Sequence, residues 1–374
     1  MDLVQAVDTY PFDSISCNGR KIGLRDILNN NATPLSGFEA SAYSFIQQWF
    51  SGTEIFVQIT SGSTGVPKSI VITRNQMIAS ARLTQLALQL KSGDTSFVCL
   101  DPEYIAGKMM LVRSFVTGMN IIAADPSANP FLNIPMGVSI DFTALVPFQL
   151  YEILGSSEVS KLNLTKKILV GGAALNHEAQ ILLSKVNARI YATYGMTETV
   201  SHVALQAVNG PQASKYFTIL PGVKIETDSR GCLVIEAPYL AEKIITNDLV
   251  EIKDHIHFKW IGRQDNIINT GGVKVIPEKI EGLINTFFAQ RGIENKFLIV
   301  GMPDSTLGYK VTLLIEGEIS EISVDIIKAG LSKILPKYEI PKEIYINVNF
   351  VLTKSGKINR SETAASWELA QSGP

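Results

Sequence analysis

The chain has 374 residues, of which 46% are hydrophobic and 18% are charged, and its formal net charge is −2. Two domains are expected, because this length is at the upper edge of what one domain holds. The near-neutral charge gives no support for a nucleic-acid partner or a polybasic membrane anchor. The cysteines Cys17, Cys99 and Cys232 lack C-x-x-C spacing, so neither a disulfide framework nor a zinc site is indicated. No signal peptide and no apolar run of about 18 residues is found, which predicts a soluble cytoplasmic protein.

The first part of the chain predicts two helices and two short strands. Residues 38–50 carry an apolar helical face, and residues 54–60 are β-branched and aromatic, as expected of a buried strand. A second strand is expected at residues 69–73, where Thr73 and Gln76 have the spacing of a capping box that opens a helix. We expect the buried stripe of this helix to be Leu83, Leu86, Ala87 and Leu90, and its end to be Gly93.

The loop between the two strands reads TSGSTGVPK, from Thr60 to Lys68. Its glycines let backbone N–H groups turn toward an anion, its hydroxyl groups add donors, and its lysine adds a mobile positive charge. The alternative is a plain surface turn. The loop is not a Walker A motif, because Pro67 precedes the lysine and the glycines are too closely spaced. We predict a polyphosphate site formed by Thr60, Ser61, Gly62, Ser63, Thr64, Gly65 and Lys68.

Further along, apolar runs alternate with helical or loop segments, which is typical of a layered α/β fold. The expected strands are residues 97–100, 120–124, 142–146, 167–170 and 189–193. Beyond Pro211, short strands with turn residues predict a β-rich subdomain. We therefore expect an α/β protein with a large layered domain at residues 1–263 and a small α+β domain at residues 264–374.

The run YGMTE, from Tyr194 to Glu198, follows the last of these strands. An aromatic ring can stack on a purine, a hydroxyl group can donate to a phosphate, and a carboxylate can bind a Mg²⁺ ion that bridges phosphate oxygens. Alone, the run is also compatible with a strand end and a solvated glutamate. Together with the loop at residues 60–68, it resembles the signatures of one known superfamily.

Both runs resemble signatures of the acyl-adenylating superfamily, which comprises acyl-CoA ligases, luciferases and the adenylation domains of peptide synthetases. The resemblance covers roughly residues 54–360 and implies the fold of that superfamily. It implies that Tyr194 stacks on adenine, that Thr197 contacts the α-phosphate and that Glu198 binds Mg²⁺. The other nucleotide contacts that it implies nearby are Gly171, Gly172, Ala173, Gly195 and Met196.

Two further motifs of the superfamily follow in its order. Asp248 stands where a T-G-D motif binds ribose, although Asn247 replaces the usual glycine. The run Gly262-Arg263-Gln264-Asp265 resembles a motif in which the arginine also contacts ribose and the aspartate is the hinge between the domains. Residues 264–374 are accordingly expected to form a mobile lid.

The last motifs lie in the small domain. The loop Thr270, Gly271 and Gly272 resembles the segment that faces CoA. Lys357, in KSGKINR, resembles a mobile lysine that reaches the α-phosphate and the acyl carboxylate, although Val351 stands at the usual proline position. The resemblance thus assigns catalysis to Lys68, Thr197 and Lys357.

Among compact members, the chain looks most like the o-succinylbenzoate–CoA ligases of menaquinone synthesis, because of TYGMTET-x-SH and residues 101–110. Relatives have a longer segment ahead of the phosphate loop, so a shortened N-terminal region is expected. The likeness places Tyr104 at an aromatic position of the acyl pocket. A dicarboxylate needs a cation near this pocket, and the candidates are Lys108, Arg113 and His202, each also compatible with a structural or surface role.

The resemblance implies two half-reactions. A carboxylate attacks the α-phosphate of Mg·ATP to give an acyl-adenylate and pyrophosphate, and the thiol of CoA then displaces AMP. No protein nucleophile is needed, so catalysis is positioning and charge neutralisation. Two alternatives stay open: a ligase or amino-acid-adenylating enzyme with another substrate, and a non-catalytic nucleotide-binding module. Lys357 disfavours the second, because binding ATP alone needs no such lysine. The oligomeric state stays open.

Overall fold

The computed structural model describes residues 10–60, 68–134, 137–172, 182–183, 186–319, 323–352 and 358–371. Contacts divide the chain into a first unit of Met1–Ile225, Ile235–Ile244 and Lys253–Phe258, and a second unit of Glu226–Val234, Ile245–Ile252 and Lys259–Pro374. The predicted boundary between residues 263 and 264 lies within the second unit. None of the helices in these described ranges is long and apolar enough to cross a membrane.

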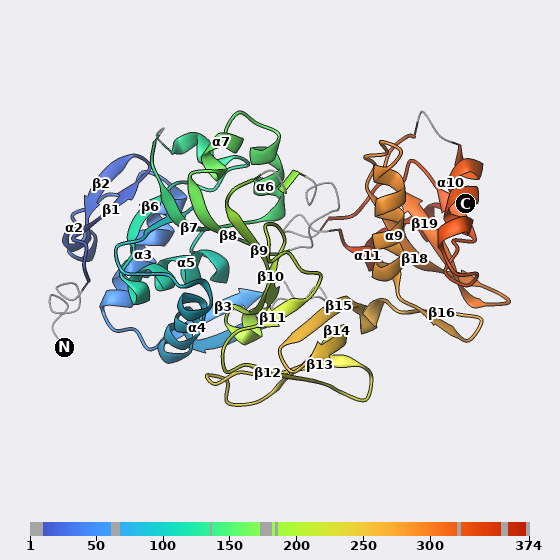
Figure 1. Ribbon diagram of the computed structural model, residues 1–374, viewed down its shortest axis with the longest axis horizontal. Coiled ribbons are helices and arrows are strands. Elements are labelled where there is room, and N and C mark those ends of the chain that lie inside the picture. The colour runs from blue at the N-terminus through green and yellow to red at the C-terminus, as the bar shows by residue number, and fades with distance from the viewer. Residues whose placement is uncertain are drawn as a thin grey trace. The chain divides into compact units, whose positions relative to one another are not determined.

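The first unit is built on a sheet whose central strands run parallel (Figure 1). From β11 onward, this sheet has the strand order β11-β10-β9-β8-β7-β5-β6-β1-β2. The strands predicted at 97–100, 120–124, 142–146, 167–170 and 189–193 are confirmed, with shifted ends. The bounds are β1 Ser14–Cys17, β2 Arg20–Gly23, β5 Thr95–Val98, β6 Asn120–Ala123, β7 Ile140–Leu145, β8 Thr165–Val170, β9 Arg189–Gly195, β10 His202–Ala207 and β11 Phe217–Ile219.

Helices cover both faces of this sheet. Helices α6 (Pro147–Leu154) and α7 (Val159–Leu162) pack Leu150, Ile153 and Leu162 against apolar residues of β5, β7, β8 and β9. On the other face, α5 (Ile105–Thr117) lies against β5 and β6. Gly107 permits this approach, because a Cβ atom there would lie 2.3 Å from the backbone of Asp101, which follows β5. The close packing therefore explains why this helix needs a glycine.

Helix α4 (Arg74–Leu88) begins as predicted but buries a different face. Thr73 accepts from the backbone N–H of Gln76, and the Gln76 side chain accepts from the backbone of Thr73, which completes the predicted capping box. The helix ends at Leu88 and not at Gly93, because Gln89 takes the left-handed conformation with φ 51°. The predicted stripe is wrong, since Leu86 is 64% exposed. The buried residues are Met77, Ser80, Ala81, Thr84 and Leu88.

The glycine-rich loop closes an antiparallel ribbon of β3 (Ile55–Thr60) and β4 (Lys68–Thr73), which confirms the predicted strand–loop–strand unit. The inner face of this ribbon places Phe56 against Phe45 and Trp49 of α3 (Gly37–Phe50). Three short elements near the N-terminus were not predicted. They are β1, β2 and helix α2 (Leu24–Leu28).

Short strands follow residue 217, as the predicted β-rich region requires. The strands β12 (Lys224–Thr227), β13 (Cys232–Glu236), β14 (Ile244–Asp254) and β15 (His257–Arg263) are divided between the two units. Short 3₁₀ helices are η1 (Pro130–Asn133), η2 (Thr197–Thr199) and η3 (Gln264–Asn266).

The second unit carries a small sheet with helices on both faces. Its strands run in the order β17-β16-β19-β18, and β20 pairs with β19. Alternate residues of β18 face opposite ways: Ile299 packs with α9 and α10, and Leu298 and Val300 pack with α11. The bounds are β16 Ile268–Thr270, β17 Val273–Val275, α9 Pro277–Ala289, β18 Phe297–Asp304, β19 Gly308–Ile315, α10 Val324–Ile334, β20 Glu343–Tyr345 and α11 Arg360–Gln371.

Candidate active site

Some of the predicted nucleotide residues lie where parallel strands of the first unit end. Strands β8 and β9 are in register through Val170 and Ala192, so Gly171 and Tyr194 follow at the same edge of the sheet. The carboxyl ends of parallel strands are where open α/β sheets bind their ligands. The register therefore brings together two motifs that the sequence predicted separately.

The two ends of the predicted phosphate loop lie side by side. Thr60 pairs with Lys68 across the β3–β4 ribbon, and Lys68 is exposed at the start of β4. Residues 61–67 therefore connect two positions that are neighbours in the ribbon. The predicted residues Ser61, Gly62, Ser63, Thr64, Gly65, Ala173 and Lys357 lie outside the described residues.

The ring of Tyr194 is 9% exposed and packs among aromatic neighbours. It meets Phe258 edge to face at a centroid distance of 5.1 Å and Phe217 at 5.8 Å. These contacts hold the ring in a fixed orientation next to the strand end. Stacking of Tyr194 on adenine stays a prediction.

A tight turn follows β9 and carries Thr197 and Glu198. Thr197 is half-buried and Glu198 is exposed. Among the residues that the structure describes, no group of three or more histidine, cysteine, aspartate or glutamate side chains could hold a metal ion. Mg²⁺ in phosphate-transfer sites is bound by one or two carboxylates together with substrate phosphates and water. The single exposed carboxylate of Glu198 therefore fits a Mg²⁺ ion that arrives with ATP.

Arg113 of α5 is 3% exposed and lies beside the same strand end. Its Nε donates to Thr84 Oγ1 over 3.3 Å, and its Nη2 donates to Ser201 Oγ and lies 3.3 Å from His202 Nδ1. His202 itself pairs with Gly195 between β10 and β9. No carboxylate among the described residues pairs with Arg113, and burial lowers the pKa of its guanidinium to about 10. A guanidinium of pKa about 10 is still protonated at neutral pH, so the site holds a buried positive charge.

His202 is neutral in this arrangement. Burial, and then the charge of Arg113, hold the pKa of His202 well below its ordinary value of 6.5. Because Nδ1 faces a guanidinium donor, this nitrogen acts as the acceptor and Nε2 carries the proton, which faces Thr84 Oγ1 at 3.1 Å. Thr84 in turn lies 3.2 Å from the carbonyl oxygen of Ser80 and donates to it. These hydrogen bonds fix the orientation of Arg113.

The other two acyl-pocket candidates lie at the start of α5. Tyr104 precedes the helix and is 64% exposed. Lys108 donates to Gln58 Oε1 over 2.8 Å, and burial lowers the pKa of Lys108. The structure thus brings Arg113 and His202 together and leaves Tyr104 and Lys108 outside their hydrogen-bonded cluster.

The predicted ribose residues lie in the second unit. Asp248 is 7% exposed and accepts from Trp260 Nε1 over 3.3 Å and from Arg263 Nη1 over 3.4 Å. Arg263 also donates to Asp265 over 2.8 Å. The three predicted residues Asp248, Arg263 and Asp265 therefore belong to one polar cluster.

The predicted CoA-facing loop is a two-residue hairpin turn. Thr270 pairs with Val273 between β16 and β17, and Gly271 and Gly272 have φ of 58° and 82°. Positive φ at both central positions is the requirement of a type I′ turn, which glycine meets without strain. The loop is therefore compact and its backbone is accessible.

Sequence reasoning missed Thr84, Thr199, Ser201 and Tyr239 at this site. Tyr239 donates to the carbonyl oxygen of Thr199 over 3.0 Å across 40 residues. Neither residue stands in a signature that names a role for it. The one signal for this cluster is that Arg113 is buried without a counter-ion among the described residues. Burial depends on the tertiary structure, so the sequence does not reveal it.

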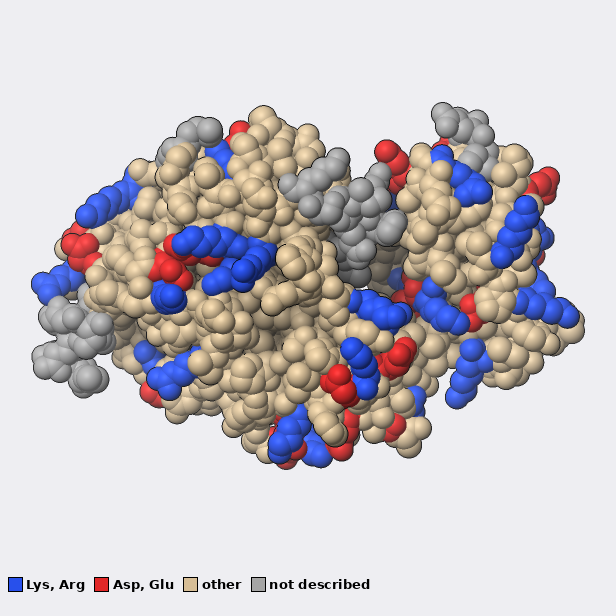
Figure 2. Space-filling view, in the orientation of Figure 1, with Lys and Arg blue, Asp and Glu red and all other residues tan. Residues whose placement is uncertain are grey.

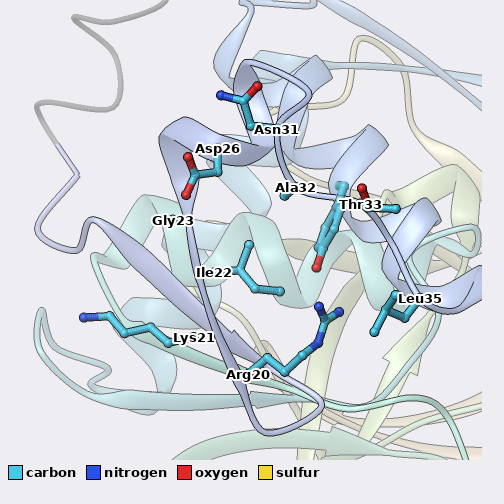
Figure 3. Close-up of a pocket in the computed structure, with 10 residues that line it drawn as sticks. Arg20, Lys21, Ile22, Gly23, Asp26, Asn31, Ala32, Thr33 and Leu35 are labelled. Carbon is cyan, nitrogen blue, oxygen red and sulfur yellow. The ribbon is translucent and has the colours of Figure 1, made fainter.

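A separate pocket of about 310 Å³ lies near the N-terminal strands. In Figure 3, Arg20 points into it, whereas Lys21 extends away. Arg20 is paired with the buried carboxylate of Glu39, and none of the predicted site residues lines the pocket. On the face drawn in Figure 2, lysine and arginine side chains lie among acidic ones and form no continuous field of one sign. The candidate active site is therefore the edge at β8, β9 and β10.

The chain belongs to the AMP-binding enzyme family, whose model matches residues 40–233. It is similar to an acyl-CoA synthetase (AMP-forming)/AMP-acid ligase II-like protein from Dyadobacter fermentans, with 40% identity, a TM-score of 0.61, and coverage of 91% of this chain and 97% of that one. It also resembles o-succinylbenzoate coenzyme A synthetase (MenE) from Bacillus subtilis in complex with ATP and a magnesium ion, at 15% identity and a TM-score of 0.77, covering 96% and 98% of the two chains. The predicted fold is confirmed.

A curated relative is the 2-succinylbenzoate–CoA ligase of Staphylococcus aureus strain JH9, which is 28% identical over 336 residues. The match covers 82% of this chain and 66% of the relative, so the chain spans just under two thirds of that protein.

Proposed function

We propose that the protein is an AMP-forming ligase that converts a carboxylic acid to its acyl-adenylate and then to its CoA thioester, and that the acid is o-succinylbenzoate. The choice of substrate rests on one observation. The buried guanidinium of Arg113 has no carboxylate partner among the described residues. A buried charge is costly unless an opposite charge pairs with it. A substrate with a second carboxylate supplies that partner, and the relatives named for o-succinylbenzoate support this choice.

In the first half-reaction, a carboxylate oxygen of the acid attacks the α-phosphorus of ATP, and the bond to pyrophosphate breaks. Lys68, Thr197 and Lys357 position the phosphates and neutralise their charge. Glu198 would hold the Mg²⁺ ion, which supplies Lewis-acid charge neutralisation when bound. Arg113 pairs with the second carboxylate, so it orients the reacting carboxylate without touching it.

In the second half-reaction, the sulfur of CoA attacks the acyl carbon, AMP leaves, and the thiol proton is lost to solvent. Asp248 and Arg263 bind the ribose of the nucleotide. Residues 264–374 act as a lid with a hinge at Asp265. The loop Thr270, Gly271 and Gly272 presents its backbone to CoA. The two roles of the lid explain how one small domain serves two reactions in turn.

The buried cation also weighs against an amino-acid-adenylating enzyme. Such a substrate brings an ammonium group, which the like charge of Arg113 would repel, and no described carboxylate pairs with Arg113 to offset its charge. A non-catalytic nucleotide-binding module would leave the buried charge of Arg113 without a purpose.

The test is acid-dependent ATP–pyrophosphate exchange with o-succinylbenzoate, benzoate, hexanoate and amino acids, followed by thioester formation with CoA. We expect turnover of o-succinylbenzoate. Arg113→Gln should raise the KM for o-succinylbenzoate by about tenfold or more, because the substrate carboxylate loses its ion pair. Arg82→Gln, on the exposed side of α4, is the matched control. Activation of benzoate or hexanoate but not of o-succinylbenzoate would refute the proposed substrate. Absence of exchange with every acid would refute the proposed ligase activity.

A further inference from the structure

Val200 has a backbone conformation that a β-branched residue rarely adopts. Its φ of 64° and ψ of −50° lie near the γ-turn with positive φ, and the backbone N–H of Ser201 donates to Thr199 O over 2.7 Å to close that turn. Val200 is 1% exposed. Strained residues of this kind persist only when their surroundings over-determine them, and they concentrate at functional sites.

Two described side chains hold this γ-turn in place. Tyr239 Oη donates to Thr199 O over 3.0 Å, the same oxygen that closes the turn. Thr199, which is fully buried, has its Oγ1 2.9 Å from Met196 O and 2.8 Å from Ser201 O, and this Oγ1 accepts from the N–H of Met196 over 3.0 Å. The hydroxyl group therefore spans the turn from end to end. Burial raises the pKa of Tyr239 to about 12, so its hydroxyl stays a donor at neutral pH.

The γ-turn lies between the two binding functions of the site. On one side it continues from Thr197 and Glu198, the proposed phosphate and Mg²⁺ residues. On the other side Ser201 accepts a hydrogen bond from Arg113, the proposed partner of the substrate carboxylate. A shift of Arg113 toward a bound anion would therefore act on Ser201, and through the shared Thr199 oxygen on the residues that face the nucleotide.

We propose that Tyr239 and Thr199 are positioning residues whose hold on the Val200 γ-turn couples binding of the acid at Arg113 to binding of Mg·ATP at Thr197 and Glu198. The proposal rests on the proposed function, because it assumes both ligands. Coupling of this kind is reciprocal: each ligand strengthens the other by the same factor, typically about fivefold or more.

The test measures the Kd of a non-hydrolysable ATP analogue in the presence of Mg²⁺. The measurement is made with and without saturating o-succinylbenzoate. The parent should bind the nucleotide about fivefold or more tightly when the acid is present. In Tyr239→Phe this factor should fall to near one, while the Kd for the nucleotide alone changes little. Tyr216→Phe, at a tyrosine whose ring lies under Lys215 and Lys253, should keep the parent's factor. A purely structural role would weaken both Kd values together.

Thr199 provides a second, independent pair of variants. Thr199→Val removes the hydroxyl group at nearly constant volume and should abolish the coupling, whereas Thr199→Ser keeps the hydroxyl and should retain it. The inference would be overturned if Tyr239→Phe had the same coupling factor as the parent. Loss of coupling in Thr199→Ser would also overturn it. A parent without exchange activity toward any acid would instead refute the proposed function.

Discussion

Asn247 donates its side-chain N–H groups to both carboxylate oxygens of Asp265, over 3.0 and 3.2 Å. Its own Oδ1 accepts from Arg230 Nη1 over 2.9 Å, so the amide orientation is determined from both ends. The sequence resemblance expects a glycine at this position, and a glycine could make neither contact. In this chain, hydrogen bonds therefore tie the segment at residues 246–248 to the proposed hinge at Asp265.

The first prediction concerns that tie. Asn247→Gly should make the segment around Asp265 more susceptible to limited proteolysis, because both hydrogen bonds to Asp265 are lost. Asn247→Asp should increase cleavage further, since it places two carboxylates together. Only the effect of Asn247→Asp should shrink at high salt, which screens exposed charges. Equal resistance of Asn247→Asp and the parent at low salt would contradict the role of this tie.

The second prediction is a pH dependence of stability that arises from His202. The pKa of His202 in the folded state lies well below 6.5, so below that pH the unfolded chain binds a proton that the folded protein does not. The free energy of unfolding should therefore fall as the pH drops below 6.5, by at most about 1.4 kcal/mol per pH unit from this group. Denaturant unfolding between pH 7.5 and 5 should show a shallower slope in His202→Gln. His255→Gln, at an exposed histidine, is the control.

The third prediction concerns the ion pair of Arg360 and Glu281 in the second unit. Arg360 Nη1 and Nη2 donate to the two carboxylate oxygens of Glu281 over 2.7 and 3.0 Å, and Nη1 also donates to Ile299 O. Arg360→Ala should lower the free energy of unfolding of this unit by about 2 kcal/mol, below the range for fully buried pairs because both side chains are partly exposed. Arg360→Lys should recover only part of this loss, since an ammonium cannot form two parallel hydrogen bonds.

The matched control for Arg360 is the exposed pair of Lys296 and Glu316, at 3.3 Å. Lys296→Ala should change the free energy of unfolding by less than about 1 kcal/mol. An Arg360→Ala effect no larger than this would show that the pair contributes little.

The fourth prediction concerns Lys68. Because Lys68 is exposed at the start of β4, Lys68→Ala should leave the unfolding curve nearly unchanged. It should reduce ATP–pyrophosphate exchange by about tenfold or more, since a charge that faces the phosphates is lost. Lys91→Ala, at another exposed lysine of the first unit, is the control. Parent-like exchange in Lys68→Ala would remove the loop from the proposed site.

The fifth prediction separates the half-reactions. Lys357→Ala should abolish formation of the adenylate and should still convert supplied acyl-adenylate to the thioester. Asp265→Pro, which restricts the backbone at the proposed hinge, should impair the thioester step more than adenylation. Rapid-quench assays of each half-reaction measure both effects. Equal loss of both steps in Lys357→Ala would exclude this division of labour.

Local patterns in the sequence determined the elements and the signatures. The capping box at Thr73 and Gln76, the strand before Lys68 and the run from Tyr194 to Glu198 can be predicted because each depends on residues only a few positions apart. The signatures also identify the family, since their order along the chain is itself specific. These patterns do not determine which face of a helix or strand packs against which neighbour.

Tertiary packing decided the rest. The apolar spacing of α4 predicted a buried Leu86, yet the structure buries Thr84, because its hydroxyl group completes the hydrogen bonds of Arg113 and His202 from other elements. The positive φ of Val200 likewise opposes the local preference of a β-branched residue. Such arrangements are stable only because buried polar groups must find partners across the fold, and those partners are separated by tens of residues in the sequence.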